Sequence, residues 1–136
     1  MIFHINAYKR FSTKTNMELV ALLSSGKGTW GQVSGLMKKG EWEKIILFGP
    51  DYAREFNVDG VAFDFIEYNP EKSITSLKEE FLKKLKEKLG SGFLNEVALS
   101  LASGSGKEHM ALISALLSVP VGVRFTALTK DGIVFM

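Results

Sequence analysis

The sequence predicts an α/β fold, a doubly wound, mainly parallel sheet of strand order 3-2-1-4-5 with an antiparallel hairpin strand at the C-terminus. Two observations support this prediction. Apolar runs of strand length alternate with segments that repeat apolar residues at helical spacing, a pattern typical of right-handed crossovers between parallel strands. Near its end the chain has Asp131-Gly132 between two apolar runs, which is the strongest short signal of a hairpin.

The predicted strands are read from the apolar runs. Several of them are apolar almost throughout, as expected where helices cover both faces of a sheet. The predicted strands are Glu18–Ser24, Lys44–Gly49, Gly60–Tyr68, Glu96–Ala102, Val121–Leu128 and Ile133–Met136.

The predicted helices lie between these strands and place apolar residues three and four positions apart, on one helix face. The longest of them fills its other face with Lys and Glu. Glycine and proline residues mark several of their ends. The predicted helices are Trp30–Lys39, Pro50–Phe56, Asn69–Leu89 and Met110–Leu117.

The chain of 136 residues has the size of one domain. We expect a single domain over residues 17–136. It follows an N-terminal extension, residues 1–16, that consists of a short strand, Met1–Tyr8, and a polar loop.

Composition excludes several functional classes. The net charge is only +2, whereas proteins that bind duplex DNA usually have a concentrated stripe of basic residues. We therefore expect no direct binding of duplex DNA. The absence of cysteine excludes disulfides and cysteine-bound zinc, and the distant pair His4 and His109 predicts no metal site. No secretion signal and no apolar run of membrane-spanning length is visible, which favours a cytoplasmic protein.

The predicted topology is Rossmann-like and reverses direction between the first and fourth strands. Ligands of such sheets bind at the carboxyl ends of the strands at this switch point. Two loops rich in glycine and serine leave these two strands, so we expect Ser24–Thr29 to lie beside Ser103–Lys107.

Both loops have residues suited to phosphate. Glycine allows the backbone to approach a ligand closely, each loop leads into the N-terminus of a helix, and lysines and hydroxyl groups add donors. The alternative is that the glycines and serines only form tight turns. The candidate ligand-binding residues are Ser24, Ser25, Gly26, Lys27, Gly28, Thr29, Ser103, Gly104, Ser105, Gly106, Lys107 and His109.

Nucleotide-binding motifs fit these loops poorly. A P-loop needs glycine at position 101 and Ser or Thr after the lysine, and the sequence has Leu101 and Glu108. Gly26 to Gly31 matches G-x-G-x-x-G, which alone is a weak signal of dinucleotide binding. His109 is either a general acid–base or phosphate donor, or simply a residue in the first turn of a helix.

The segment from Leu19 to Gly49 resembles the start of CRISPR-associated Rossmann-fold (CARF) domains. The stretch from Ser100 to Ala111 is similar to their second signature, a glycine-containing loop with a basic residue before a helix rich in Met or Ala. The resemblance covers Glu18 to Met136. It implies a homodimer whose paired loops bind cyclic oligoadenylate, a ring of RNA-type phosphates, with no cofactor.

Some CARF domains also cleave the ring without metal, by attack of a ribose 2′-hydroxyl on the adjacent phosphate. The resemblance then makes Lys107 the stabiliser of the charged transition state, and Ser24 or Ser25 the positioning donor. The sequence departs from the family in that Ser105 splits the glycines of the second loop. We also expect no effector domain, which leaves a stand-alone sensor, a ligand-degrading enzyme, or a subunit that works through a partner. The competing interpretations are another Rossmann-like nucleotide-binding or phosphoesterase domain, and a structural interaction subunit without ligand.

Overall fold

The computed structural model describes residues 17–24, 27–89 and 95–136. The predicted N-terminal extension lies outside these residues. Six strands form one sheet of order β3-β2-β1-β4-β5-β6, which confirms the predicted fold class. Neighbouring strands are parallel except for the antiparallel pair of β5 and β6. The strands are β1 (Glu18–Leu22), β2 (Lys44–Gly49), β3 (Asp64–Glu67), β4 (Glu96–Ser100), β5 (Gly122–Thr129) and β6 (Gly132–Phe135).

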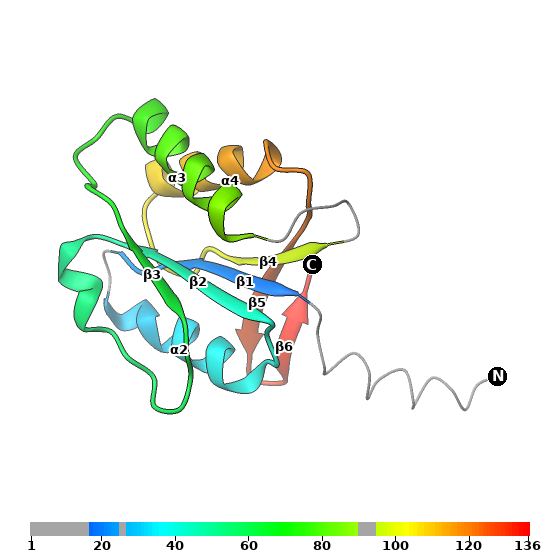
Figure 1. Ribbon diagram of the computed structural model, residues 1–136. Coiled ribbons are helices and arrows are strands. Elements are labelled where there is room, and N and C mark those ends of the chain that lie inside the picture. The colour runs from blue at the N-terminus through cyan, green and yellow to red at the C-terminus, as the bar shows by residue number, and fades with distance from the viewer. Residues whose placement is uncertain (1–16, 25–26, 90–94) are drawn as a thin grey trace.

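Helices cover both faces of the sheet (Figure 1). One face is covered by α2 (Trp30–Lys39), and the other by α3 (Ile74–Lys88) and α4 (Gly106–Leu117), which lie side by side. Two short 3-10 helices, η1 (Lys27–Thr29) and η2 (Asp51–Glu55), follow β1 and β2.

The continuous apolar run of β1 is explained by this double cover. Val20 and Leu22 belong to the hydrophobic core under α3 and α4. Leu19, Ala21 and Leu23 belong to the core under α2. All five side chains are completely buried. Alternate residues from Leu19 to Leu23 thus fill two separate cores, and none of these five faces water.

Two helices begin at other residues than predicted, because capping serines set their starts. Ser73 accepts a hydrogen bond from the N–H of Ser76 at 3.2 Å, so α3 begins at Ile74 and not at Asn69. Ser105 is the N-cap of α4, which begins at Gly106, four residues before the predicted start. Lys107, Glu108 and His109 are therefore in the first turn of α4 and not in the preceding loop.

The strand β3 is shorter than predicted because its first residues form a turn. The N–H of Val61 donates to the carbonyl of Val58 at 3.1 Å, and Gly60 has a φ of 78°, which glycine adopts without strain. Pairing with β2 begins only at Asp64, opposite Ile46.

Within the described residues, no helix has the length and apolar character needed to cross a membrane. The same part of the chain contains no group of three His, Asp or Glu side chains arranged to hold a metal ion.

Candidate functional site

The two glycine- and serine-rich loops meet at the switch point, where β1 and β4 lie side by side. The backbone N–H of Ser24, just after β1, donates to Ser103 Oγ, just after β4, at 2.9 Å. Both residues are buried, with 4% and 1% of their surface exposed. The two loops therefore lie side by side, as expected, and their first residues are joined by a direct hydrogen bond.

A buried carboxylate, that of Glu108, lies at the centre of this junction. Its Oε2 accepts a hydrogen bond from the hydroxyl of Ser24, with 2.8 Å between the two oxygens. The same Oε2 accepts a second hydrogen bond from the hydroxyl of Tyr68, which follows β3. Its Oε1 accepts from the backbone N–H of Ser105 at 2.7 Å. Only 3% of Glu108 is exposed. One side chain thus joins the carboxyl ends of β1 and β3 to the start of α4.

These hydrogen bonds determine the charge states of the junction. Burial alone raises the pKa of Glu108, but donors from Tyr68, Ser105 and Ser24 outweigh it, and the pKa lies below its ordinary value. Burial and the hydrogen bond to the carboxylate raise the pKa of Tyr68 far above its ordinary value. At neutral pH Glu108 is therefore a carboxylate and Tyr68 keeps its proton.

The second loop is folded tightly onto itself. His109 Nε2 lies within hydrogen-bond distance of the carbonyl oxygen of Ser103, at 2.9 Å. Because a carbonyl oxygen can only accept, Nε2 carries the proton in this hydrogen bond. Gly104 between them has a φ of 106°. A Cβ there would stand 3.2 Å from Glu108 Oε1, His109 Nε2 and Leu22 Cδ1. Glycine is therefore required at position 104 by both its backbone conformation and the space around it.

Lys107 points away from this junction. Its Nζ donates to the carbonyl oxygens of Pro70 and Lys72, at 2.8 and 2.9 Å, in the connection between β3 and α3. The side chain is exposed. Carbonyl partners are neutral, so the full positive charge stays on the surface near the N-terminus of α4.

The first loop is described in part. Ser25, Gly26 and the side chain of Lys27 lie outside the described residues. Gly28 lies on η1 and, like Gly106 on α4, would have no atom within 4 Å of an added Cβ. Thr29 is the last residue of η1, and Trp30 Nε1 next to it donates to the carbonyl of Ser24 at 3.0 Å.

Neither Glu108 nor Tyr68 is among the site residues that the sequence predicts. A signal for Glu108 was present, because Ser105-x-x-Glu108 is the pattern of a capping box, in which Glu three residues after the N-cap bonds back to its N–H. Nothing in the local sequence around Tyr68 indicates its role, which depends on the pairing of β3 with β2.

The comparisons with known proteins add no relative. No family model matches the sequence, and no curated protein and no solved structure shows significant similarity to it.

Proposed function

We propose that this chain binds a cyclic oligoadenylate at the carboxyl ends of β1 and β4, as a sensor or as a metal-independent ring nuclease. The observation that supports this most is the meeting of the two loops, with Ser24 N–H bonded to Ser103 Oγ at 2.9 Å. A ligand with several phosphates needs donors from both loops at one place, and a single tight turn could not supply them.

The phosphate groups would lie over the N-terminus of α4. Gly106 and Lys107 are its first two residues, and the N–H groups of a first turn have no partner within their own helix. The helix dipole favours negative charge at the same end. Gly106 is exposed and surrounded by open space, so a phosphate could approach its backbone closely.

The negative charge of Glu108 does not exclude an anion here, because its carboxylate is buried and directed inward. Its acceptors are taken by Tyr68, Ser24 and the N–H of Ser105. The Ser24 hydroxyl therefore uses its one hydrogen-bond donor on Glu108, and we assign Ser24 a role in holding the two loops together. Donation to the ligand from the first loop falls to Ser25 in this proposal.

Lys107 supplies mobile positive charge. Exchanging its hydrogen bonds to the neutral carbonyls of Pro70 and Lys72 for one to a phosphate oxygen adds the attraction between opposite charges to the hydrogen bond. If the ring is cleaved, the 2′-hydroxyl loses its proton to water as its oxygen bonds to phosphorus, the bond from phosphorus to the 5′-oxygen breaks, and the 5′-oxygen takes up a proton from water. Lys107 stabilises the charge of the five-coordinate phosphorane.

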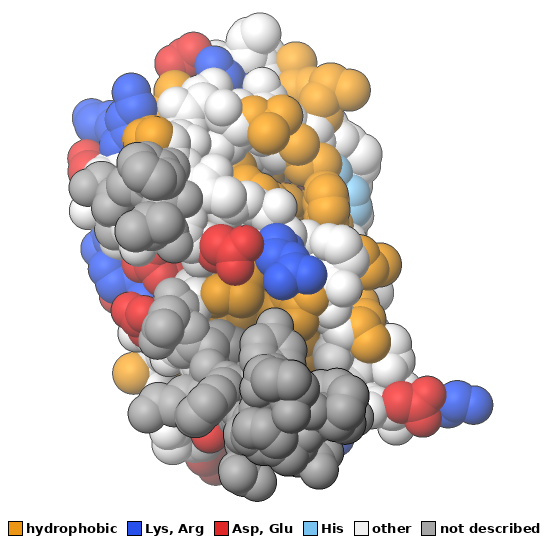
Figure 2. All heavy atoms as spheres, turned by 90° about the vertical axis from the view of Figure 1, so that its right-hand side faces the viewer, with side chains coloured by type: hydrophobic (Ala, Val, Ile, Leu, Met, Phe, Trp, Pro, Cys, Tyr) orange, Lys and Arg blue, Asp and Glu red, His pale blue; other side chains and the backbone are white. Residues whose placement is uncertain are grey.

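The proposed ligand-bound form is a homodimer. Figure 2 shows hydrophobic side chains gathered over α4 and the β5–β6 hairpin. They include Leu117, 74% exposed, and Phe125, 39% exposed. Among the residues that the structure describes, β6 is the last strand of the sheet, and one of its edges has no neighbouring strand there. We propose that a second copy of the chain covers this surface.

The test measures binding and turnover together, with labelled cyclic tetra-adenylate and hexa-adenylate in the presence of EDTA. Retention with product formation identifies a metal-independent ring nuclease, and retention without product identifies a sensor. Lys107→Ala should weaken retention about tenfold, the effect of one charge-assisted hydrogen bond. Lys83→Ala, an exposed lysine on α3, is the matched control and should change nothing. No retention of either ring by the folded protein would overturn the proposal.

A further inference from the structure

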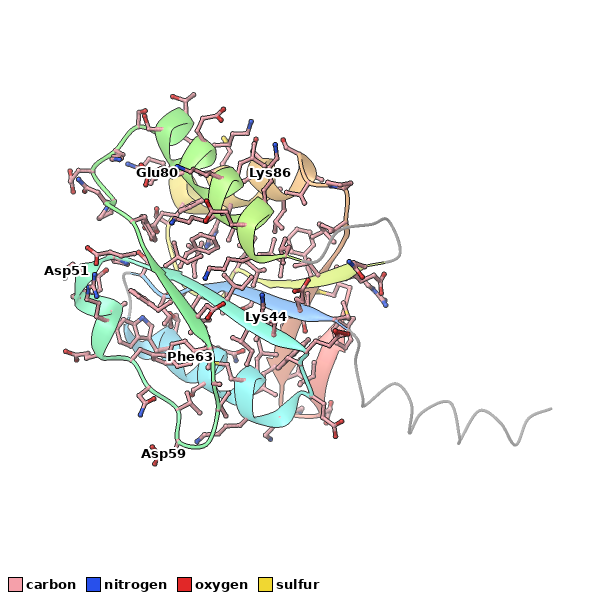
Figure 3. The ribbon with its side chains drawn as sticks, viewed as in Figure 1. Lys44, Asp51, Asp59, Phe63, Glu80 and Lys86 are labelled. Carbon is pink, nitrogen blue, oxygen red and sulfur yellow. The ribbon has the colours of Figure 1, made fainter. Side chains whose placement is uncertain are left out.

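A concave site lies on the side of the sheet that α2 covers, between α2 and the segment 56–59 that leads to β3. It has a volume of about 330 Å³, within the range of small-ligand pockets. Figure 3 shows Asp59, one of its lining residues, on the side of the sheet that α2 covers, whereas Glu80 and Lys86 lie on the opposite side. The pocket is therefore separate from the α4 site.

One wall of the pocket is a fixed aromatic surface. Trp30 and Phe56 line it, with their rings edge to face and 5.8 Å between centroids. Tyr52 lies parallel to Trp30, 6.4 Å away, and Phe63 packs edge to face on Phe56 at 5.9 Å. The hydrogen bond from Trp30 Nε1 to the carbonyl of Ser24 holds the indole in place and connects the pocket to the end of β1.

Gly31 leaves the pocket open. It is the second residue of α2, where glycine disfavours the helix. Gly35 on the same helix is explained by packing, because its Cβ would stand 2.4 Å from Leu128 Cδ2. Neither packing nor backbone conformation requires glycine at position 31, since its φ is not positive and no described atom lies within 4 Å of an added Cβ. An occupant of the pocket would explain a glycine at this position.

The rim of the pocket provides hydrogen-bonding groups beside the aromatic wall. Asn57 offers one acceptor and two donors on an amide plane, and Asp59 offers carboxylate acceptors. Both residues are exposed. Ser34 Oγ donates to the carbonyl of Gly31 at 3.1 Å, so it faces a ligand as an acceptor. The set thus suits a planar ring that both donates and accepts hydrogen bonds.

We propose that this pocket binds a purine base. The base would stack on the face of either Trp30 or Phe56 and meet the other ring, which stands at 85° to the first, edge to face. An exocyclic amine would donate to Asp59 or to the Asn57 carbonyl, and a ring nitrogen would accept from the Asn57 amide, the pairing that asparagine makes with adenine. That the base is adenine, and that it belongs to the ligand of the α4 site, rests on the proposed function.

Adenosine tests the pocket alone, because it has the base and no phosphate. Trp42→Phe leaves Trp30 as the one tryptophan of the chain. Titration of this variant with adenosine up to the millimolar range, the order of affinity expected of a small fragment, should quench Trp30 fluorescence in a saturable way. Uridine, with a smaller ring and no exocyclic amine, should bind at least fivefold more weakly.

Two variants locate the binding. Gly31→Leu places a side chain in the open space beside the pocket and should weaken adenosine binding at least tenfold. Gln32→Leu adds a leucine at the next, exposed position of α2, outside the pocket lining, and should leave it unchanged. Asn57→Leu, at an exposed position that tolerates substitution, should also weaken binding. The absence of saturable quenching, or equal adenosine affinity in both leucine variants of α2, would overturn the inference.

The same variants separate this inference from the proposed function. Adenosine binding that Gly31→Leu removes, in a protein that retains no cyclic oligoadenylate, supports the pocket and refutes the proposed function. Full retention of cyclic oligoadenylate by Gly31→Leu, with loss from Lys107→Ala, supports the proposed function and refutes the pocket as its base site.

Discussion

The hydroxyl of Ser24, just after β1, donates a hydrogen bond to the carboxylate of Glu108, with 2.8 Å between Oγ and Oε2, although 84 positions separate the two residues in the chain. The same carboxylate oxygen accepts the hydroxyl proton of Tyr68. The ends of two strands, β1 and β3, therefore converge on one buried charge at the start of α4. The position of both loops of the candidate site depends on this junction.

Removal of the Glu108 carboxylate should destabilise the protein. Glu108→Ala leaves two buried hydroxyls and the N–H of Ser105 without their acceptor, and the expected loss is about 2–4 kcal/mol in the free energy of unfolding. Urea denaturation at pH 7 measures it. Glu87→Ala removes a glutamate, half-exposed on α3, that pairs with Lys84, and should cost less than about 1 kcal/mol. Equal losses in the two variants would show that the junction is energetically unimportant.

The stability of the protein should fall in acid because of the same residue. The pKa of Glu108 is lowered in the folded protein, so between that pKa and the ordinary value of 4.5 the unfolded chain binds more protons. The contribution of Glu108 is complete above 4.5 and is lost as pH falls through the folded pKa. Glu108→Gln lacks this titration. Its deficit against the natural sequence should shrink between pH 6 and pH 3, and a constant deficit would contradict the lowered pKa.

Tyr68 should produce the opposite dependence in alkali. Its pKa is raised above the ordinary value of 10.0, so the unfolded chain loses its proton first and stability falls as pH rises past that value. Tyr68→Phe removes this titration together with one hydrogen bond to Glu108. At pH 7 the Tyr68→Phe variant should be less stable than the natural sequence by about 1–2 kcal/mol, because the lost hydrogen bond has a charged acceptor. The difference should decrease above pH 10 in guanidinium unfolding.

The order of the strands could be predicted because each local pattern agrees with the fold. Strands buried on both faces read as continuous apolar runs, and right-handed crossovers leave few topologies. The predicted hairpin is present and turns at Lys130 and Asp131, and Gly132, with a φ of 116°, is the first residue of β6 and pairs with Thr129. The expected meeting of the loops after β1 and β4 follows from that order alone.

The orientation of the site residues could not be predicted in the same way. Lys107 and Glu108 are neighbours on α4, and successive helix residues point about 100° apart. One therefore reaches the connection before α3 and the other the core. Which of them is buried depends on the start of α4 at Gly106 and on partners as distant as Ser24 and Tyr68. A glutamate in the first turn of a helix is usually solvated, so pattern alone gave no reason to bury it.

The exposed apolar surface over α4 and the β5–β6 hairpin should mediate self-association. Sedimentation should give the mass of a dimer, and Phe125→Glu should shift it to the monomer because it places a charge on that surface. Tyr52→Glu is the matched control. It changes an aromatic residue of similar exposure, 46% against 39%, on η2. A monomeric natural sequence, or a dimer unchanged by Phe125→Glu, would contradict the proposed interface.

The two glycines of the second loop should respond oppositely to alanine. Gly104→Ala forces a side chain into a φ of 106°, 3.2 Å from Glu108, His109 and Leu22, and should cost about 2–3 kcal/mol of stability. Gly106→Ala meets no atom within 4 Å in the first turn of α4, so stability should stay equal or rise by up to about 1 kcal/mol. Under the proposed function, the methyl group that Gly106→Ala adds obstructs the approach of phosphate to the backbone.

The Gly106→Ala variant should therefore keep its melting temperature in thermal unfolding and yet bind cyclic oligoadenylate more weakly. Normal binding by this variant would remove the N-terminus of α4 from the ligand site.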